Sequence, residues 1–367
     1  MLSSLEIRNF RTFHHLRIER LGRVNLVVGK NNVGKTTLLE ALRLYGSFWP
    51  GRTAHLILNE RNEVSSSSEG ERILLLPSLF HGRHPKEGDS IAIGPIGTDS
   101  GPGFQAEMCS RDDAAPSSSG EMKALGTHPV VEFRCADREY VLRPDGSLGY
   151  RIPSGGAKPP DFDPEVPCVP GAGLEEDELA RYWDAISLTD SEARVLQAAE
   201  LVVPLKRVAF VNDPRSNDRM AKVRVEDISD PIPLAELGDG VVRFFQIAVG
   251  LEYSDYRAKK LFEAGLLMEN VHPMLLIDEV ESGIHHTLHA QLWKFILRAA
   301  RLLDVQVVAT THSHDCLIGF AQALADDEQA DGQVVRLERS EGEEATRAVV
   351  ISREKLSIVA RDAIEVR

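Results

Sequence analysis

Long apolar runs are missing from this sequence. No stretch reaches the roughly 18 consecutive apolar residues that a helix needs to cross a lipid bilayer. The first residues also lack the apolar core of a signal peptide, because Glu6 and Arg8 interrupt them. We therefore expect a cytoplasmic protein with no membrane partner.

Cysteine is scarce as well. The four cysteines, Cys109, Cys135, Cys168 and Cys316, lie far apart and form no CxxC pair. Their spacing matches none of the common patterns of zinc sites, redox motifs or disulfide frameworks. We expect ordinary buried or surface thiols.

Positive charge is in deficit. The chain has 42 Lys and Arg residues against 56 Asp and Glu residues, which gives a net charge of −14. This balance repels nucleic acid over most of the surface. Residues 8–23, which are rich in Arg and His, are the best candidate for a local basic patch, but we interpret them as the solvated face of a strand. DNA as a partner stays open, without support from the net charge.

Both ends of the chain have the pattern of an α/β protein. Alternating residues in 3–28 predict strands, the last of which leads into a glycine loop, and residues 37–45 predict a helix with a broad apolar face. After β character returns at 207–211, two apolar runs ending at Ile277 and Thr310 predict strands buried on both faces of a parallel sheet. A closing strand pair is expected at 334–337 and 348–351.

The middle of the chain differs, because it is rich in Pro, Gly and Ser at 65–68, 116–120 and 153–173, which predicts loops. Short strand-like runs occur at 90–93, 130–135, 139–142 and 148–152. Asp145-Gly146 predicts a hairpin turn, and Thr189 with Glu192 predicts the start of the second of two helices. We therefore predict an α/β fold, a mixed sheet with flanking helices, built from residues 1–45 and 205–367, with residues 46–204 as an inserted β/α arm.

A glycine loop between the last of the first strands and the first helix is the most specific motif. Residues 29–36 read GKNNVGKT and fit the pattern GxxxxGK[ST] in full. Backbone amides of such a loop and the helix N-terminus bind phosphates, the lysine reaches the β and γ oxygens, and the threonine hydroxyl ligates Mg²⁺. The predicted nucleotide-binding residues here are Gly29, Asn31, Asn32, Gly34, Lys35, Thr36 and Thr37.

Two carboxylates end the apolar run 274–277 and form a Walker B strand. Strand ends meet at one edge of a parallel sheet, where ligands bind in α/β proteins. We predict that Asp278, together with Thr36, ligates Mg²⁺, and that Glu279 orients or deprotonates the water that attacks the γ-phosphate. Lys35 and Glu279 are thus predicted catalytic residues.

The next apolar strand, 307–310, also ends in polar residues. We predict that His312 contacts the γ-phosphate or the attacking water and acts in catalysis as a γ-phosphate sensor. Upstream, Gly238, Asp239 and Gly240 precede an apolar helix and offer a second place to bind an anion through free amides.

In this order, the motifs resemble those of the ABC-type ATPases, in particular the AAA family of the RecF, SMC and OLD group. The segment Leu237-Gly238-Asp239-Gly240 resembles the signature of the short OLD-like members. The resemblance covers roughly residues 1–45 and 205–367, and it implies an ABC-type P-loop ATPase core. It also implies a homodimer that encloses two ATP molecules, in which residues 238–240 of one subunit cover the nucleotide held by the other.

The resemblance has limits. Full-length OLD proteins carry a TOPRIM nuclease domain after the ATPase, and residues 313–367 are too few for it. SMC and Rad50 relatives insert long coiled coils, whereas residues 46–204 show no sustained heptad repeat. We therefore expect a dimerising, Mg²⁺-dependent ATPase that acts as a regulatory or sensor engine for a separate protein effector. A nuclease or toxin would fit, as in family members used in defence against phage.

Other functions stay open at this stage. A RecF-like DNA-repair ATPase would clamp duplex DNA when ATP closes the dimer. A transporter subunit would carry a Leu-Ser-Gly-Gly signature, which is absent from the sequence. The glycine loop recognises phosphate and not the base, but no guanine-reading Asn-Lys-x-Asp motif is present, so we favour ATP over GTP.

Three further features are ambiguous. Residues 281–285 resemble the family's Glu-x-Gly-Leu-His segment, which would contact the second subunit. His285, His286 and His289 could suggest a metal, since positions 285 and 289 would share a helix face, but we favour a helix surface without metal. Gln105 is a weak candidate for the extra magnesium ligand found in many ABC ATPases.

Overall fold

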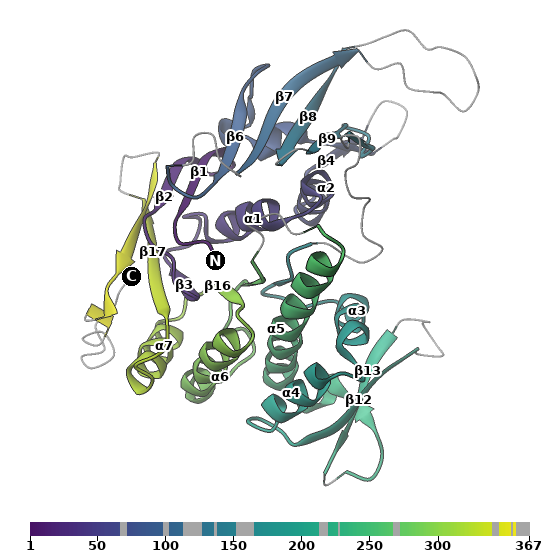
Figure 1. The fold of residues 1–367 in the computed structure, drawn as a ribbon, viewed down its shortest axis with the longest axis vertical. Coiled ribbons are helices and arrows are strands. Elements are labelled where there is room, and N and C mark those ends of the chain that lie inside the picture. Colours follow the sequence, from purple (N-terminus) through teal and green to yellow (C-terminus); the bar gives the residue numbers. More distant parts are fainter. Residues whose placement is uncertain are drawn as a thin grey trace.

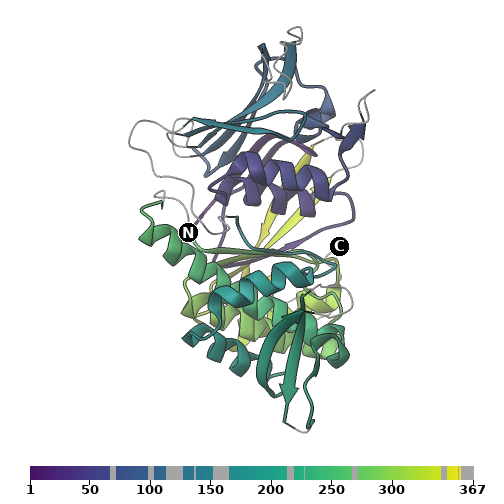
Figure 2. The same cartoon turned by 90° about the vertical axis from the view of Figure 1, so that its right-hand side faces the viewer.

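Two β-sheets with one helix between them organise the protein (Figure 1). In the computed structural model, the described residues are 1–66, 72–97, 103–112, 127–135, 138–151, 165–212, 219–226, 228–266, 272–339, 345–353 and 355–356. Figure 2 shows the layers in order: an antiparallel sheet, helix α1 (Lys35–Gly46), a mixed sheet seen nearly edge-on, and a layer of helices. The predicted α/β fold with flanking helices is confirmed.

The mixed sheet has six strands, of which five are parallel. In spatial order they are β11 (Cys168–Val169), β15 (Met274–Ile277), β16 (Gln306–Thr310), β3 (Val24–Val28), β17 (Gly332–Arg339) and β18 (Thr346–Ile351). β18 pairs antiparallel with β17, which confirms the predicted closing hairpin. The carboxyl ends of β3, β15 and β16 therefore lie at one edge of three neighbouring strands.

Alternating side chains of the mixed sheet enter two separate cores, because successive residues of a strand face opposite ways. Leu275 and Ile277 pack with the helices on one face, whereas Met274 and Leu276 pack with α1 on the other. The helices of the first face are α5 (Asp239–Glu263), α6 (His289–Leu302) and α7 (His314–Asp326). Burial on both faces explains the near-continuous apolar runs, and the strands predicted at 274–277 and 307–310 are confirmed.

The other large sheet has seven antiparallel strands in the order β10-β9-β8-β7-β6-β1-β2. They are β1 (Leu5–Phe10), β2 (Phe13–Ile18), β6 (Ser90–Gly94), β7 (Phe104–Asp112), β8 (Thr127–Cys135), β9 (Arg138–Leu142) and β10 (Leu148–Arg151). The Asp145-Gly146 turn joins β9 to β10 as predicted, with the Asp145 carboxylate accepting a hydrogen bond from the Ser147 amide at 2.8 Å. Strands of residues 46–204 thus extend the sheet that β1 and β2 begin, and their separation as an inserted arm stays a prediction.

The smaller elements surround these layers. They are α2 (Pro50–Glu60), α3 (Glu176–Ile186), α4 (Asp190–Ala199), β4 (Val64–Ser66), β5 (Arg72–Leu74), β12 (Leu205–Asn212), β13 (Arg219–Val225), β14 (Ile232–Pro233), and the 3₁₀ turns η1 (Leu76–Leu79), η2 (His81–Arg83), η3 (Leu234–Leu237) and η4 (His286–Leu288). The predicted helix start at Thr189 is confirmed, since its hydroxyl accepts a hydrogen bond from the Ser191 amide at 3.2 Å. Within the described part of the chain, no helix combines the length and apolar character needed to cross a membrane.

Several sequence-based assignments were wrong or incomplete. The β character predicted at 207–211 is confirmed as part of β12, but this strand pairs with β13 in a separate antiparallel sheet of β12, β13 and β14 that was not predicted, and Leu205 and Val208 are its buried residues. Strand β11 lies inside a stretch predicted to be a loop, and α2 and β7 were not predicted at all. The loop predicted at 65–68 was wrong for residues 65 and 66, which pair with β5 as part of β4. The rest of that loop, the loop at 116–120 and residues 153–164 of the last loop lie outside the described residues.

Trp293 provides a test of the helical layer. Its side chain is fully buried, its indole N–H donates to the Cys316 carbonyl oxygen at 3.1 Å, and its ring meets Phe320 edge-on at 4.7 Å. We expect Trp293→Ala to lower the free energy of unfolding by about 3–5 kcal/mol, because it opens a cavity between α6 and α7. Urea denaturation measures this loss. Leu302→Ala, on the same helix but with 71% of the side chain exposed, should change it by less than about 0.5 kcal/mol.

Candidate functional site

The loop of residues 29–34 joins β3 to α1 and requires glycine at two positions. Gly29 has a φ of 152°, and a side chain there would lie 2.5 Å from the carbonyl oxygen of Leu337. Gly34 has a φ of 104°, and a side chain there would lie 2.6 Å from the ring of Phe13. The predicted strand, glycine loop and helix are all present. Glycine at 34, immediately before α1, leaves the first amides of the helix free of a side-chain cap.

Lys35 lies over this loop. Its ammonium group donates to the carbonyl oxygens of Gly29 at 2.7 Å and Lys30 at 3.0 Å. Burial lowers the pKa of the Lys35 ammonium, and the nearby carboxylates of Asp278 and Glu279 oppose that shift. The loop therefore holds a partly desolvated positive charge beside two acidic groups, which is a suitable environment for a phosphate.

Asp278 joins the three parallel strands at their carboxyl ends. One of its carboxylate oxygens accepts a hydrogen bond from the Thr36 hydroxyl at 3.1 Å, and the other accepts one from the Thr310 hydroxyl. Thr310 ends β16 and also accepts a hydrogen bond from the Glu279 amide at 2.9 Å. A hydroxyl and a carboxylate in contact provide the hard oxygen ligands that Mg²⁺ prefers, so the pair predicted from the sequence fits that ion.

Glu279 is held in an unusual backbone conformation, with a φ of 47°. A side chain at Gly171, in the segment after β11, would lie only 3.0 Å from the Glu279 carboxylate. The imidazole Nδ1 of His312 lies 3.7 Å from the Glu279 carboxylate and 3.6 Å from that of Glu281. The structure thus brings together the two residues that the sequence predicted to act on the γ-phosphate and its attacking water.

The other predicted loop residues have different surroundings. Asn31 and Asn32 are exposed on the loop, and Asn32 has a left-handed φ of 64°. Thr37 is buried in the first turn of α1 and borders a polar cavity of about 280 Å³. Arg11 and Thr12, from the turn between β1 and β2, also border this cavity. The space beside the phosphate loop is therefore lined by Thr37 together with residues that the sequence did not predict to bind nucleotide.

Gly238, Asp239 and Gly240 form the start of α5. Gly238 has a φ of 92° and precedes the helix as its N-cap residue. A side chain at Gly240 would lie 3.0 Å from the carbonyl oxygen of Gly283, in the loop that follows β15. Within one chain, these residues therefore pack on the Walker B segment, and their contact with a second subunit's nucleotide stays a prediction.

Two weaker candidates lie apart from this site. His285 precedes η4, whereas α6 begins at His289, so the two positions do not share a helix face. The prediction that His289 lies on an exposed helix surface was wrong, because its side chain is buried. Among the described residues, no group of three or more His, Cys, Asp or Glu side chains has the geometry of a metal site. Gln105 lies on β7 of the antiparallel sheet, whereas Thr36 and Asp278 follow strands of the mixed sheet.

Four residues of the site were missed. Thr310 ends the apolar run 307–310, and Glu281 begins the segment 281–285, so both lie inside motifs noted in the sequence. A strand pattern does not show, however, which polar residue at the end of the strand forms a hydrogen bond with a neighbouring segment. Gly171 follows a strand too short to detect, and Arg243 lies in an apolar helix. Arg243 is only 3% exposed and donates to the backbone carbonyl oxygens of residues 170, 278 and 279. Contacts of this kind depend on the tertiary fold.

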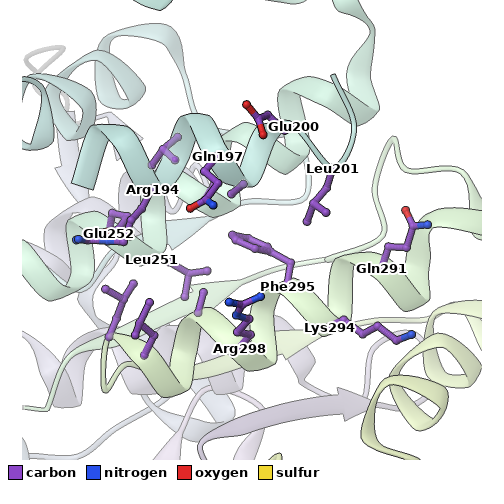
Figure 3. Close-up of a pocket in the computed structure, with 16 residues that line it drawn as sticks. Arg194, Gln197, Glu200, Leu201, Leu251, Glu252, Gln291, Lys294, Phe295 and Arg298 are labelled. Atoms are coloured by element: carbon purple, nitrogen blue, oxygen red, sulfur yellow. Dashed lines mark hydrogen bonds and ion pairs between the residues drawn. The ribbon is translucent and has the colours of Figure 1, made fainter. Parts of the chain in front are cut away.

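A second, wider cavity of about 820 Å³ lies between α4, α5 and α6 (Figure 3). Phe295 projects across it, Arg298 lies on the same wall, and Leu201, 53% exposed, lies at one end. Arg194 and Glu252 form an ion pair of 2.6 Å at the other end. None of its lining residues belongs to the phosphate loop or to residues 278–284 directly after β15, so this cavity is distinct from the candidate nucleotide site.

Comparison with known families separates the chain into two matching segments. Residues 1–47 match a family described as "AAA ATPase domain", and residues 206–318 match one described as "AAA domain, putative AbiEii toxin, Type IV TA system". The first segment contains the glycine loop, and the second contains Asp278, Glu279 and His312. Each match includes one half of the site described above.

Individual relatives are distant. An "ATP/GTP phosphatase" of Helicobacter pylori is 22% identical over 86% of both chains. The "DNA replication and repair protein RecF" of Nitrosococcus oceani is 31% identical over 96 residues, which are 26% of this chain and 24% of that protein. A crystal structure of an SMC head bound to the C-terminal winged-helix domain of ScpA overlaps 96% of this chain and 98% of its own, with a TM-score of 0.48 and 12% identity.

The two family matches fall on the two halves of one site, and RecF is among the relatives. These matches support the predicted ABC-like P-loop ATPase of the RecF/SMC group. For an ATPase of this group, the loop at 29–36 and the carboxylates at 278 and 279 are the expected chemical parts, and here they lie in direct contact through Thr36 and Asp278. The matches therefore support the membership that the sequence motifs predicted, while the OLD-like subgroup stays a prediction.

Thr310 offers a test of how this ATPase site is held. Thr310→Val removes the acceptor of the Glu279 amide and the donor to Asp278, in a position with no exposed surface. An unpaired buried amide costs about 1–3 kcal/mol, so we expect ATP hydrolysis to fall by roughly tenfold or more. A phosphate-release assay measures this. Thr310→Ser keeps the hydroxyl and should retain activity within about threefold; equal losses in both variants would contradict the role of the hydroxyl.

Proposed function

We propose that the protein binds and hydrolyses ATP with Mg²⁺ and forms a dimer through ATP. The observation that carries this proposal is the contact between the Thr36 hydroxyl and the Asp278 carboxylate, with Glu279 next in the chain and His312 beside it. Gly29, Gly34 and the first amides of α1 would hold the phosphates, with Lys35 neutralising the β and γ oxygens. When bound between Thr36 and Asp278, Mg²⁺ supplies charge neutralisation to the phosphates.

Hydrolysis needs a base near the attacking water. Glu279 is 48% exposed and its carboxylate lies close to the His312 imidazole, so it can receive the proton while the water oxygen bonds to the γ-phosphorus. The bond between that phosphorus and the β–γ bridging oxygen breaks, and ADP leaves. His312 would orient the γ-phosphate or the water. Thr310 fixes the backbone of Glu279 during this step through the amide hydrogen bond.

The start of α5 supports a dimer that depends on ATP. A side chain at Gly238 would meet nothing within 4 Å, which makes this end of the helix accessible to another molecule. A γ-phosphate of a second subunit fits a helix N-terminus preceded by glycine. In this arrangement, residues 238–240 of one subunit complete the site of the other. The match of this signature to OLD-like ATPases rests on the resemblance of Leu237 to Gly240.

We infer that a separate protein reads the ATP state. The family described with the AbiEii toxin supports an output in bacterial defence, with a nuclease or toxin as the effector. We further propose that residues 1–45 and 205–367 form the ATPase core and that residues 46–204 are an elaboration of it. ATP is an intracellular substrate, which supports a cytoplasmic protein. Because a relative is named an ATP/GTP phosphatase, GTP belongs in every assay beside ATP.

Glu279→Gln is the decisive variant for this function. The amide cannot accept the proton from water, so we expect hydrolysis to fall by about 100-fold or more while ATP still binds. Slow turnover should trap the ATP-bound state, and size-exclusion chromatography with ATP and Mg²⁺ should then show a stable dimer. EDTA should abolish both effects. Normal hydrolysis by the variant, or the absence of any ATP-linked dimer, would show that the base or the dimer is wrongly assigned.

A second candidate is a RecF-like ATPase that clamps DNA, and the RecF relatives favour it. The net charge of −14 argues against it. A clamp should retain duplex DNA only with ATP, with an affinity that falls steeply with salt because phosphate contacts release counterions. We expect no ATP-dependent retention in a filter-binding assay at 50–200 mM salt, a range of the order used for such contacts. Salt-sensitive retention by Glu279→Gln with ATP would instead support the clamp.

A further inference from the structure

Arg243 is a buried cation on α5. Its side chain is 3% exposed, and its guanidinium donates to the carbonyl oxygen of Pro170 and to those of Asp278 and Glu279, the last at 3.0 Å. Burial lowers its pKa to about 10, although nearby carboxylates, Asp278 first among them, oppose that shift. Arg243 therefore stays positively charged at neutral pH, and its two terminal nitrogens donate to backbone carbonyl groups at the ends of two neighbouring strands.

The backbone that Arg243 contacts is strained. Glu279 has a left-handed φ of 47°, a conformation that costs free energy for a residue with a side chain and persists only where the surroundings hold it. Its amide donates to Thr310 at 2.9 Å, and its carbonyl oxygen accepts from Arg243 at 3.0 Å. Both polar groups of this residue's backbone are thus fixed, one by β16 and the other by α5.

The same helix begins with the signature residues. Gly240 approaches the Gly283 carbonyl oxygen, and Arg243 follows three residues later, within the next turn of α5. A helix turn is stiff, so a displacement of residues 238–240 also displaces the guanidinium. Since Arg243 spans the ends of β11 and β15, the displacement reaches the Glu279 backbone directly.

We propose that Arg243 is a positioning residue that connects the start of α5 to the Glu279 backbone, so that the signature segment controls where the Glu279 carboxylate lies. The proposal rests on the proposed role of Glu279 as the base. It adds a physical route by which a second molecule at residues 238–240 switches hydrolysis on. Arginine suits the position because its planar, five-donor group reaches three carbonyl oxygens at once, which a lysine ammonium on a flexible stem cannot match.

The test compares two buried arginines of α5. Arg257 is 1% exposed and also donates to a backbone carbonyl oxygen, that of Gly46, but at the other end of the helix. We expect Arg243→Lys to lower kcat for ATP by about 10- to 100-fold, with KM within about threefold, because a small misplacement of a catalytic group costs that much. Arg257→Lys should leave kcat within about twofold at a similar loss of stability in urea. Equal effects of the two variants would overturn the proposal.

A double-mutant cycle separates positioning from a general structural role. If Arg243 acts through Glu279, then Arg243→Lys should reduce single-turnover hydrolysis by less than about twofold in a Glu279→Gln background. A loss as large as in the wild-type background would refute the connection. If Glu279→Gln alone hydrolyses ATP normally, the proposed base is wrong and this proposal falls with it, which is a different result from an additive cycle.

Folding of the variants is checked by circular dichroism and ATP binding. Should Arg243→Lys not fold, Arg243→Met removes the buried charge while it keeps an elongated side chain, and it should show the same loss of kcat. Failure of both variants to fold would assign Arg243 to stability alone and overturn the proposal.

Discussion

Asp278 accepts hydrogen bonds from two hydroxyls, and the rest of the site depends on this arrangement. Thr36 belongs to the start of α1 after β3, and Thr310 ends β16, so one carboxylate binds the segments that follow or end three parallel strands. The contact is possible only because β15, β16 and β3 pair side by side in one register. Parallel pairing in turn requires helical crossovers, which is why α5, α6 and α7 cover one face of the sheet.

Electrostatics in the site oppose the character of the whole chain. The protein has a net charge of −14, yet Lys35 and Arg243 are both placed where burial lowers their pKa. Their partners are mainly backbone carbonyl oxygens and not carboxylates. Lys35, which is only partly buried, remains available to a phosphate, and the buried Arg243 adds positive charge behind it. The site can therefore attract a triphosphate although the surface in general repels it.

The sequence predicted the parts of the site that depend on local pattern. The loop at 29–36 and the carboxylates at 278 and 279 follow buried strands, and such strands are visible as apolar runs. The sheet to which a short amphipathic strand belongs is not visible in this way, so the sequence predicted β character at 207–211 but not the separate three-stranded sheet that contains it. Helix α2 was not predicted because it begins with Pro50 and Gly51, two residue types that usually indicate a loop. In the first turn of a helix, proline is tolerated because its missing N–H has no partner there in any case.

Residues that hold the site could not be predicted, because their partners are distant in sequence. The carbonyl oxygens bound by Arg243 belong to positions 170, 278 and 279. Gly171 allows a close approach to Glu279 that no local pattern records. The two arginines of α5 illustrate the general reason: an arginine in an apolar helix looks like a solubilising residue until the fold shows that backbone carbonyl groups surround it.

These two arginines also define how α5 can move. Arg257 binds the end of α1 through Gly46, and Arg243 binds the ends of β11 and β15. Sixteen residues of this 25-residue helix are buried, so bending it would break many packed contacts. A force at Gly238 is therefore resisted by the helix as a rigid body. The helix would therefore move mainly at the contacts that join it to the sheet and to α1. The contact nearest to Gly238 is that of the Arg243 guanidinium with the strained backbone of Glu279.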